Sequence, residues 1–190
     1  MTTTTNIRVL LLSTVLLALV ACDATAVKPE PVKSEAVAAP AAPAVPVVPS
    51  APAAEAVMKV VWHVDFAEPR RLSAMIQNVN NMVTTYQSDL AEYDVRIVFV
   101  AAGIRFLTTD PLTGTPFAED KELKTRRDEL IQRLQQLREV QNVKLELCEI
   151  TREAINLPKG KIIPGVESVR SGVVRIAELQ HQGFAYLKVE

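Results

Sequence analysis

The sequence is poor in the residues from which most catalytic and metal centres are built. Among its 190 residues are only two cysteines, two histidines and six glycines. The histidines and cysteines match no zinc-ligand spacing, and the glycines form neither a GxGxxG nor a Walker loop. No Gly-x-Ser-x-Gly elbow is present either. These absences leave a zinc enzyme, a nucleotide-binding protein and a serine hydrolase without support, and we expect no metal and no cofactor.

Neither sign of charge is in excess. The chain carries 21 lysines and arginines against 22 aspartates and glutamates. A nearly neutral chain has no net field that would attract nucleic acid or anionic lipid. We therefore expect no nucleic-acid partner.

Long apolar runs are rare, and the clearest one lies near the N-terminus. Val9–Ala21 is apolar apart from one serine and one threonine. A span across a bilayer takes about 20 residues, so this run is too short and has instead the length of a signal-peptide core. It ends in Leu-Val-Ala-Cys, which resembles the bacterial lipobox and implies a lipoprotein signal peptide over residues 1–21 with Cys22 as the acylated N-terminus. An ordinary signal peptide with a chance cysteine is the alternative.

A segment rich in alanine and proline follows the signal. Residues 22–56 contain seven of the twelve prolines and no glycine. Such a composition cannot build a core, and proline favours extended geometry that reaches roughly 100 Å. We expect a lipid-anchored linker that faces the periplasm, with Asp23 favouring the inner membrane. A disordered leader with no length requirement remains the alternative.

The remaining residues, 57–190, alternate between strand and helix patterns. Strands are expected at Lys59–Phe66, Val95–Ala101, Val143–Cys148, Val166–Val169 and Ala185–Val189. Helices are expected from Pro69 to about Tyr86, from near Glu119, over Ile150–Leu157 as a short turn, and from Ser171 to His181. This alternation predicts an α/β domain with a mainly parallel sheet and helices on both faces.

Cys148 is the last residue of the third expected strand, where parallel sheets keep their reactive groups. It alternates in phase with Lys144 and Glu146, which predicts that it lies on the polar side of the strand and not the buried one. The following turn and a hydroxyl from Thr151 would stabilise its thiolate, whereas the charge of Glu149 would oppose this. An inert, packed thiol is the alternative interpretation.

His63 is a second, weaker candidate. It lies in the first expected strand, in phase with Asp65, and would be a neighbour of Cys148 if both reach the same end of the sheet. A histidine satisfied within the core is the more ordinary interpretation.

Several short motifs, in order along the chain, resemble the DsrE/DsrF-like family. They are VVWHVD (60–65), MIQNVNNMV (75–83), LELCEIT (145–151) and the stretch from IIPGVESV to GFAYLKV (162–189). The resemblance implies a three-layer α/β/α fold with a five-stranded sheet, and assembly into homotrimers or homohexamers. It also implies that Cys148 corresponds to the cysteine that carries a persulfide in sulfur-relay members.

Two functions remain open at this point. The first is a membrane-tethered protein whose Cys148 accepts sulfane sulfur from a donor and passes it to an acceptor, at most a sulfur carrier or transferase. The second is a non-catalytic, oligomeric module that binds a ligand or a protein. A redox sensor that forms a sulfenic acid at Cys148 is a third variant.

Overall fold

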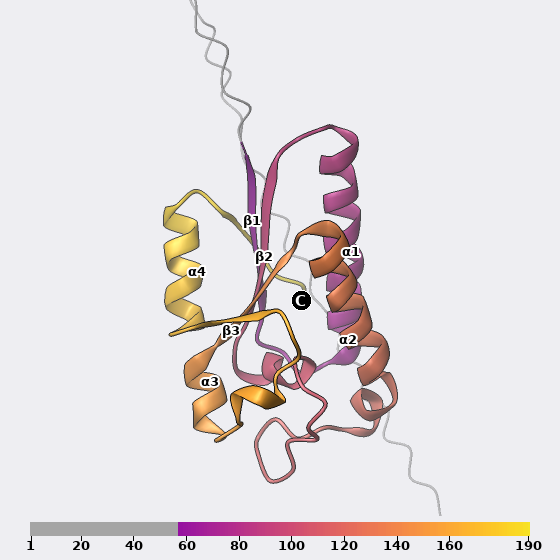
Figure 1. Cartoon of the computed structure of the whole chain (residues 1–190), viewed down its shortest axis with the longest axis vertical. Helices are drawn as coiled ribbons and strands as arrows, with labels where there is room; N and C mark the ends of the chain where they lie inside the picture. Colours follow the sequence, from indigo (N-terminus) through magenta and orange to yellow (C-terminus); the bar gives the residue numbers. More distant parts are fainter. Residues whose placement is uncertain (1–56) are drawn as a thin grey trace, which may run out of the picture. The chain divides into compact units, whose positions relative to one another are not determined.

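The computed structural model describes residues 57–190, in which a sheet lies between two layers of helices (Figure 1). The strands are β1 (Met58–Val64), β2 (Tyr93–Phe99), β3 (Lys144–Cys148), β4 (Val166–Val169) and β5 (Ala185–Leu187). The helices are α1 (Pro69–Ser88), α2 (Lys121–Gln141), α3 (Glu149–Ala154) and α4 (Gly172–His181), with short 3₁₀ turns η1 (Ala101–Phe106) and η2 (Lys159–Lys161). The predicted signal peptide and linker lie outside the described residues.

All five strands are parallel, in the order β4-β3-β2-β1-β5. The predicted three-layer α/β/α fold is therefore confirmed. Each strand pairs with its neighbour in a register that brings the carboxyl ends to one edge of the sheet. Within the described residues, no helix is long and apolar enough to cross a bilayer.

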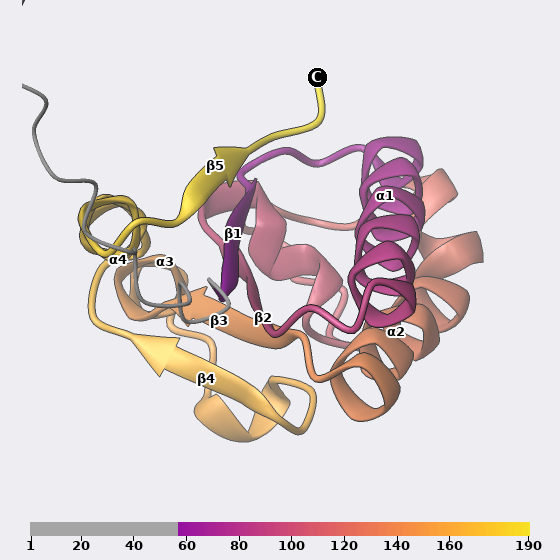
Figure 2. The same ribbon diagram turned by 90° about the horizontal axis from the view of Figure 1, so that it is seen from above.

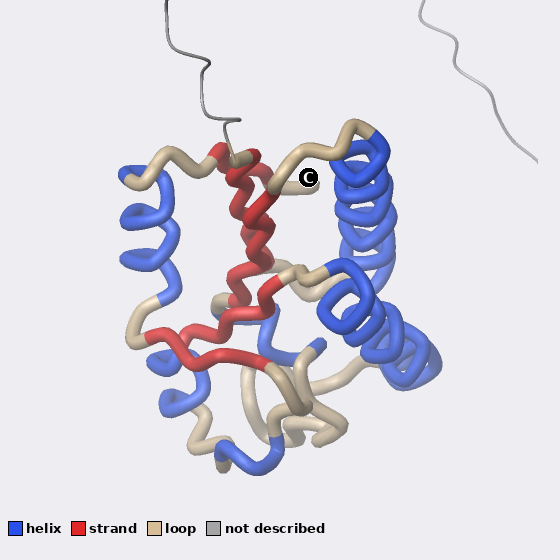
Figure 3. Tube along the Cα trace, turned by 45° about the horizontal axis from the view of Figure 1, so that its top comes forward, coloured by secondary structure: helices blue, strands red, loops and turns tan. Residues whose placement is uncertain are grey.

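The two faces of the sheet are covered unequally. Helices α1 and α2 lie side by side over one face, while α3 and α4 lie on the other (Figures 2 and 3). The short outer strands β4 and β5 form the two edges of the sheet (Figure 2). Helix α4 contacts β1, β2 and β3 and so covers the middle of the second face, while α3 contacts β3.

Local sequence explains where the two long helices begin and end. Pro69 starts α1, where its missing N–H costs no hydrogen bond. Helix α2 begins at Lys121, slightly later than predicted, because the Asp120 side chain caps it by accepting a hydrogen bond from the Leu123 N–H at 2.8 Å. Asn142 ends α2 in the left-handed conformation.

The larger core lies between the sheet and the α1–α2 layer. It contains alternate residues of the three central strands, such as Val60, Ile97 and Leu145, packed against leucines and valines of both helices. The smaller core lies under α4 and consists of Val61, Val98, Ile176, Leu179 and Phe184. Only the smaller core holds α4 by apolar contacts, so this helix depends more heavily on other interactions.

Gly172 opens α4 at a point where the helix touches the sheet. A Cβ atom on Gly172 would lie 2.5 Å from Val100 Cγ2 and 3.1 Å from the Cβ of Cys148. The predicted cap residue, Ser171, does occupy the N-cap position, but its side chain makes no capping hydrogen bond. Glycine is thus needed here because of the close approach, and not because of its backbone angles.

We predict that Gly172→Ala destabilises the fold. The added methyl group must displace α4 or a buried side chain, which costs about 1–3 kcal/mol in an overpacked site. Gly160→Ala is the matched control, because a Cβ at Gly160 would meet no atom within 4 Å. Urea unfolding of both variants measures the difference, and equal stability of the two variants would contradict the packing argument.

Candidate functional site

Cys148 lies at the carboxyl edge of the sheet, where β3 passes directly into α3. It is the last residue of β3 and the N-cap of α3, with extended backbone angles. It is a free cysteine and 4% exposed. The chain thus places the thiol at the edge where parallel α/β folds assemble their sites, but covers it almost completely.

The prediction that Cys148 avoids the buried side of β3 is wrong. Its alternation with Glu146 is as expected, but α4 covers the face on which both residues lie, and Glu146 is 0% exposed. Alternation of apolar and polar residues distinguishes two faces of a strand, but it does not show which face is solvated when the polar groups are paired. Here the polar face of β3 is an interior one.

Glu146 is satisfied by two arginines. Arg96 of β2 donates to Oε1 at 2.9 Å, while Arg175 of α4 donates to Oε2 at 2.7 Å and to Oε1 at 3.0 Å. Arg96 also donates to both carboxylate oxygens of Asp94. Burial opposes ionisation of Glu146, but the hydrogen bonds from Arg175 and Arg96 hold its pKa below the ordinary value. We call Asp94, Arg96, Glu146 and Arg175 the ion cluster.

Thr151 is a neighbour of the thiol. Its Oγ1 accepts a hydrogen bond from the Ala101 N–H at 3.0 Å, and the residue is 8% exposed. A hydroxyl can accept and donate at the same time, so this bond leaves the Thr151 proton available for the sulfur of Cys148. Ala101 adopts a positive φ of 48°, uncommon for a residue with a side chain, as the chain turns from β2 into η1.

Hydrogen-bond donors around Cys148 favour its thiolate. Burial raises the pKa of the thiol, but the Gly172 N–H, the Thr151 hydroxyl and the N–H groups of Thr151 and Ile150 together bring it below the ordinary value. The Gly172 N–H is the largest of these lowering contributions, and it belongs to the first turn of α4. The position of α4 therefore influences the ionisation of Cys148.

Glu149 opposes the thiolate less than the sequence suggests. Its carboxylate lies 2.7 Å from Arg152 Nη2 and 3.0 Å from Lys159 Nζ, and it accepts a hydrogen bond from the Ser168 hydroxyl. The hydrogen bond from Arg152 is the main reason that the pKa of Glu149 falls to about 2. Two cations thus balance this negative charge.

The structure does not bring His63 to Cys148. His63 pairs in register with Val98, and Val98 pairs with Glu146, so two strand spacings, about 10 Å, separate His63 from β3. Its Nδ1 hydrogen-bonds instead with the Tyr186 hydroxyl at 2.9 Å, and its Nε2 lies 3.9 Å from Asp65. His63 belongs to a separate polar group near β5.

We predict that His63 makes stability fall at mildly acidic pH. Burial lowers its pKa, although Asp65 acts in the opposite direction. The unfolded chain therefore binds the proton near the ordinary pKa of 6.5, and the folded chain only at lower pH. The stabilisation is present above about pH 6.5 and is lost as the pH falls through the folded-state pKa.

Urea unfolding of the wild type and of His63→Asn on both sides of pH 6.5 measures this effect. Asparagine cannot be protonated, while its side-chain oxygen can still accept from Tyr186. We expect the variant to lose part of the decrease between neutral pH and the range in which carboxylates begin to titrate. An unchanged pH dependence would show that His63 does not cause it.

An open groove adjoins the covered thiol. It has a volume of about 590 Å³ and is lined by Ile150, Val169, Arg170, Ser171, Val174, Arg175 and Glu178. Val169 is the register partner of Cys148, and Ser171 precedes the glycine that packs on its Cβ. We call this the α3–α4 groove.

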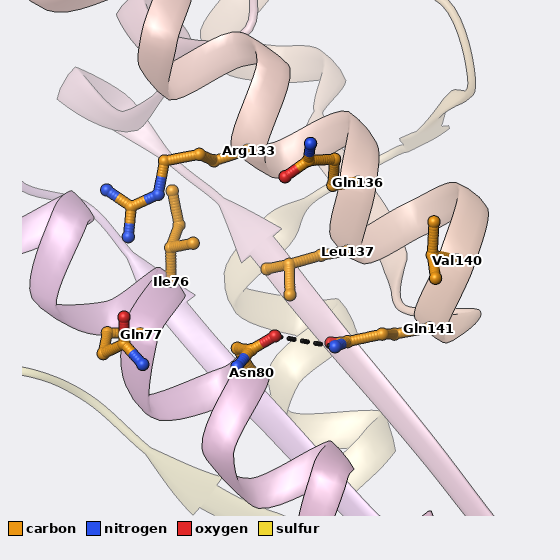
Figure 4. Close-up of a pocket in the computed structure, with 8 residues that line it drawn as sticks. All are labelled: Ile76, Gln77, Asn80, Arg133, Gln136, Leu137, Val140 and Gln141. Carbon is orange, nitrogen blue, oxygen red and sulfur yellow. Dashed lines mark hydrogen bonds between the residues drawn. The ribbon is translucent and has the colours of Figure 1, made fainter.

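A second groove runs between α1 and α2, on the opposite side of the sheet. Figure 4 shows its lining, in which Gln141 donates a hydrogen bond to Asn80 at 2.7 Å. The groove has a volume of about 360 Å³, and its lining contains amides, aliphatic side chains and Arg133 but no nucleophile. Residues 57–190 also contain no group of three or more His, Cys, Asp or Glu side chains able to hold a metal ion.

Residues 57–190 thus form a three-layer α/β/α domain with a five-stranded parallel sheet and a thiol, Cys148, at its carboxyl edge. Residues 60–189, more than half of the chain, match the model of the DsrE/DsrF-like family. The chain therefore belongs to the DsrE/DsrF-like family, as its motifs indicate.

One solved structure agrees with this assignment at the level of the fold. The chain is similar to MTH1491 from Methanobacterium thermoautotrophicum, a protein of unknown function, with 24% identity, a TM-score of 0.51, and coverage of 69% of this chain and 98% of that one. It is also similar to the ychN protein of E. coli, with 17% identity, a TM-score of 0.43, and coverage of 70% and 99% respectively. No curated protein shows a significant match.

Proposed function

We propose that Cys148 binds sulfane sulfur as a persulfide and passes it to an acceptor thiol. The observation that carries the proposal is the free thiol at the carboxyl end of β3, whose pKa is lowered by donors from α3 and α4. A lowered pKa increases the fraction of thiolate, which is the nucleophile in exchange at sulfur. Membership of the DsrE/DsrF-like family supports the same proposed role of Cys148.

The chemistry needs no metal, cofactor or external oxidant. The Cys148 thiolate attacks the terminal sulfur of a hydropolysulfide, a new S–S bond forms, and the donor leaves as a hydropolysulfide shorter by one sulfur. The acceptor thiolate then attacks the outer sulfur of the persulfide, and the thiolate of Cys148 is released. Sulfane sulfur changes carrier in both steps without net oxidation.

The α3–α4 groove is the route by which sulfur reaches the buried thiol. Ile150, two residues after Cys148, lines its wall, and Val169 continues that wall from the neighbouring strand. Polysulfide chains are small enough to enter an opening of this size. The acceptor protein brings its own thiol to the same groove.

We test the transfer by mass spectrometry on the full chain. The protein is treated with hydropolysulfide, alkylated and digested with trypsin, which releases residues 145–152 with Cys148 as their only cysteine. We expect this peptide to gain the mass of one sulfur atom in the wild type. Cys148→Ser is the control, and a wild-type peptide without added sulfur would disprove the proposal.

A second function, an oligomeric binding module, is favoured by apolar side chains beside the groove. Ile150, Val173 and Val174 are 56%, 61% and 53% exposed. Exposed apolar groups gathered in one place often mark a contact surface, here for a homotrimer, a homohexamer or another protein. In that case, Cys148→Ser retains the biological function although the chain carries no sulfur.

The proposed site of action is the periplasmic face of a bacterial membrane, with the inner membrane favoured by Asp23. The support is the lipobox-like ending of the apolar run at Cys22. Stable anchoring needs more than one acyl chain, which lipoprotein processing supplies. We predict that Cys22→Ser moves the protein from the membrane fraction to the soluble fraction, and an unchanged distribution would refute the anchor.

A further inference from the structure

Strand β3 and helix α4 touch at two successive levels. At one level Arg175 forms two hydrogen bonds with Glu146, and at the next Gly172 packs against Cys148. On β3, Glu146 and Cys148 lie two positions apart, on one face of the strand. On α4, Gly172 and Arg175 lie three positions apart, on one face of the helix.

These spacings make the two contacts interdependent. The helix rises about 1.5 Å per residue, so a shift of α4 by one residue would move the Gly172 N–H by about that distance. A hydrogen bond weakens steeply when the donor–acceptor distance grows by even part of this amount. Whatever fixes the position of Arg175 along β3 therefore also fixes Gly172, which packs against Cys148.

Glu146 is fixed very firmly. It is 0% exposed, and both of its oxygens accept hydrogen bonds from arginines. Arg175 donates from two nitrogens to the two oxygens of Glu146, and this paired geometry holds Arg175 at one position along β3. By contrast, the apolar contacts beneath α4 come from a small set of side chains, which tolerate sliding better than a two-bond ion pair does.

We propose that Glu146 and Arg175 are positioning residues for Cys148, because their ion pair sets the place of α4 and so holds the first turn of this helix, at Gly172, against Cys148. The inference rests on the proposed role of Cys148 as a sulfur acceptor. Neither residue is a catalytic residue, since each acts on the thiol through the helix. The pair thus couples a structural ion cluster to the reactivity of the thiolate.

The test measures the rate of alkylation of Cys148 against pH in the full chain, followed on the peptide of residues 145–152. The midpoint of the profile reports ionisation of the thiol. The rate on the plateau at high pH reports how easily the alkylating reagent reaches the thiol. Arg175→Met removes the ion pair, whereas Arg175→Lys keeps the charge but loses the paired geometry. Thr151→Val is the positive control, because it removes a hydroxyl donor beside the sulfur while keeping the shape of the side chain.

We expect both Arg175 variants to shift the midpoint to higher pH, as Thr151→Val does. Loss of a hydrogen bond to the thiolate would lower the thiolate fraction near neutral pH by about three- to tenfold. Leu134→Ala, in α2 on the other face of the sheet, is the control for stability: it should lower the unfolding midpoint in urea and leave the alkylation midpoint unchanged.

Two outcomes would overturn the inference. The first is an unchanged midpoint in both Arg175 variants while Thr151→Val shifts it. The second is a shift in Arg175→Met with none in Arg175→Lys, which would show that charge alone is responsible. Alkylation requires no sulfur transfer, so a wild type that takes up no sulfur would disprove the proposed function and leave this test intact.

Discussion

The buried carboxylate of Glu146 is the constraint on which the α4 side of the molecule depends. A charge without solvent contact must be paired, and the pairing draws one arginine from the neighbouring strand and another from the covering helix. Replacing such a cluster by apolar residues can leave stability unchanged. We therefore infer that the ion cluster serves to fix the position of α4 on the sheet. The ion pairs determine where α4 rests, and the small apolar core beneath it completes the layer.

The same arrangement explains why a nearly covered thiol can still favour its charged form. Burial alone would keep Cys148 neutral, yet α3 and α4 both begin next to it, and backbone N–H groups of these two helices lower the pKa of the thiol. Thr151 adds a hydroxyl, whose oxygen accepts a hydrogen bond from the Ala101 N–H. The site is therefore made mostly from backbone, which short motifs can specify without a conspicuous set of catalytic side chains.

Much of the fold could be predicted from the sequence, because apolar periodicity and helix boundaries are local properties. The strand around His63, the helix that begins at Pro69 and the location of Cys148 at a strand end all follow from neighbouring residues. The burial of Cys148 and the partners of Glu146 do not follow, since they depend on which helix covers which face. A glutamate between two leucines of a central strand was the available signal, although no single sequence identifies Arg96 and Arg175 as its partners.

The inequality of the two helical layers has a consequence for how the molecule fluctuates. The layer formed by α1 and α2 rests on an extensive apolar core, whereas α4 rests on few apolar side chains and one ion cluster. Local opening requires only the free energy of the contacts that it breaks, so α4 is expected to separate from the sheet more often than the whole domain unfolds. Solvent would then reach Cys148 through brief excursions of one helix while the larger core stays closed. Amide hydrogens of α4 should accordingly exchange before those of β1 and β2, which makes access to the thiol a property of the native ensemble and not of its average structure alone.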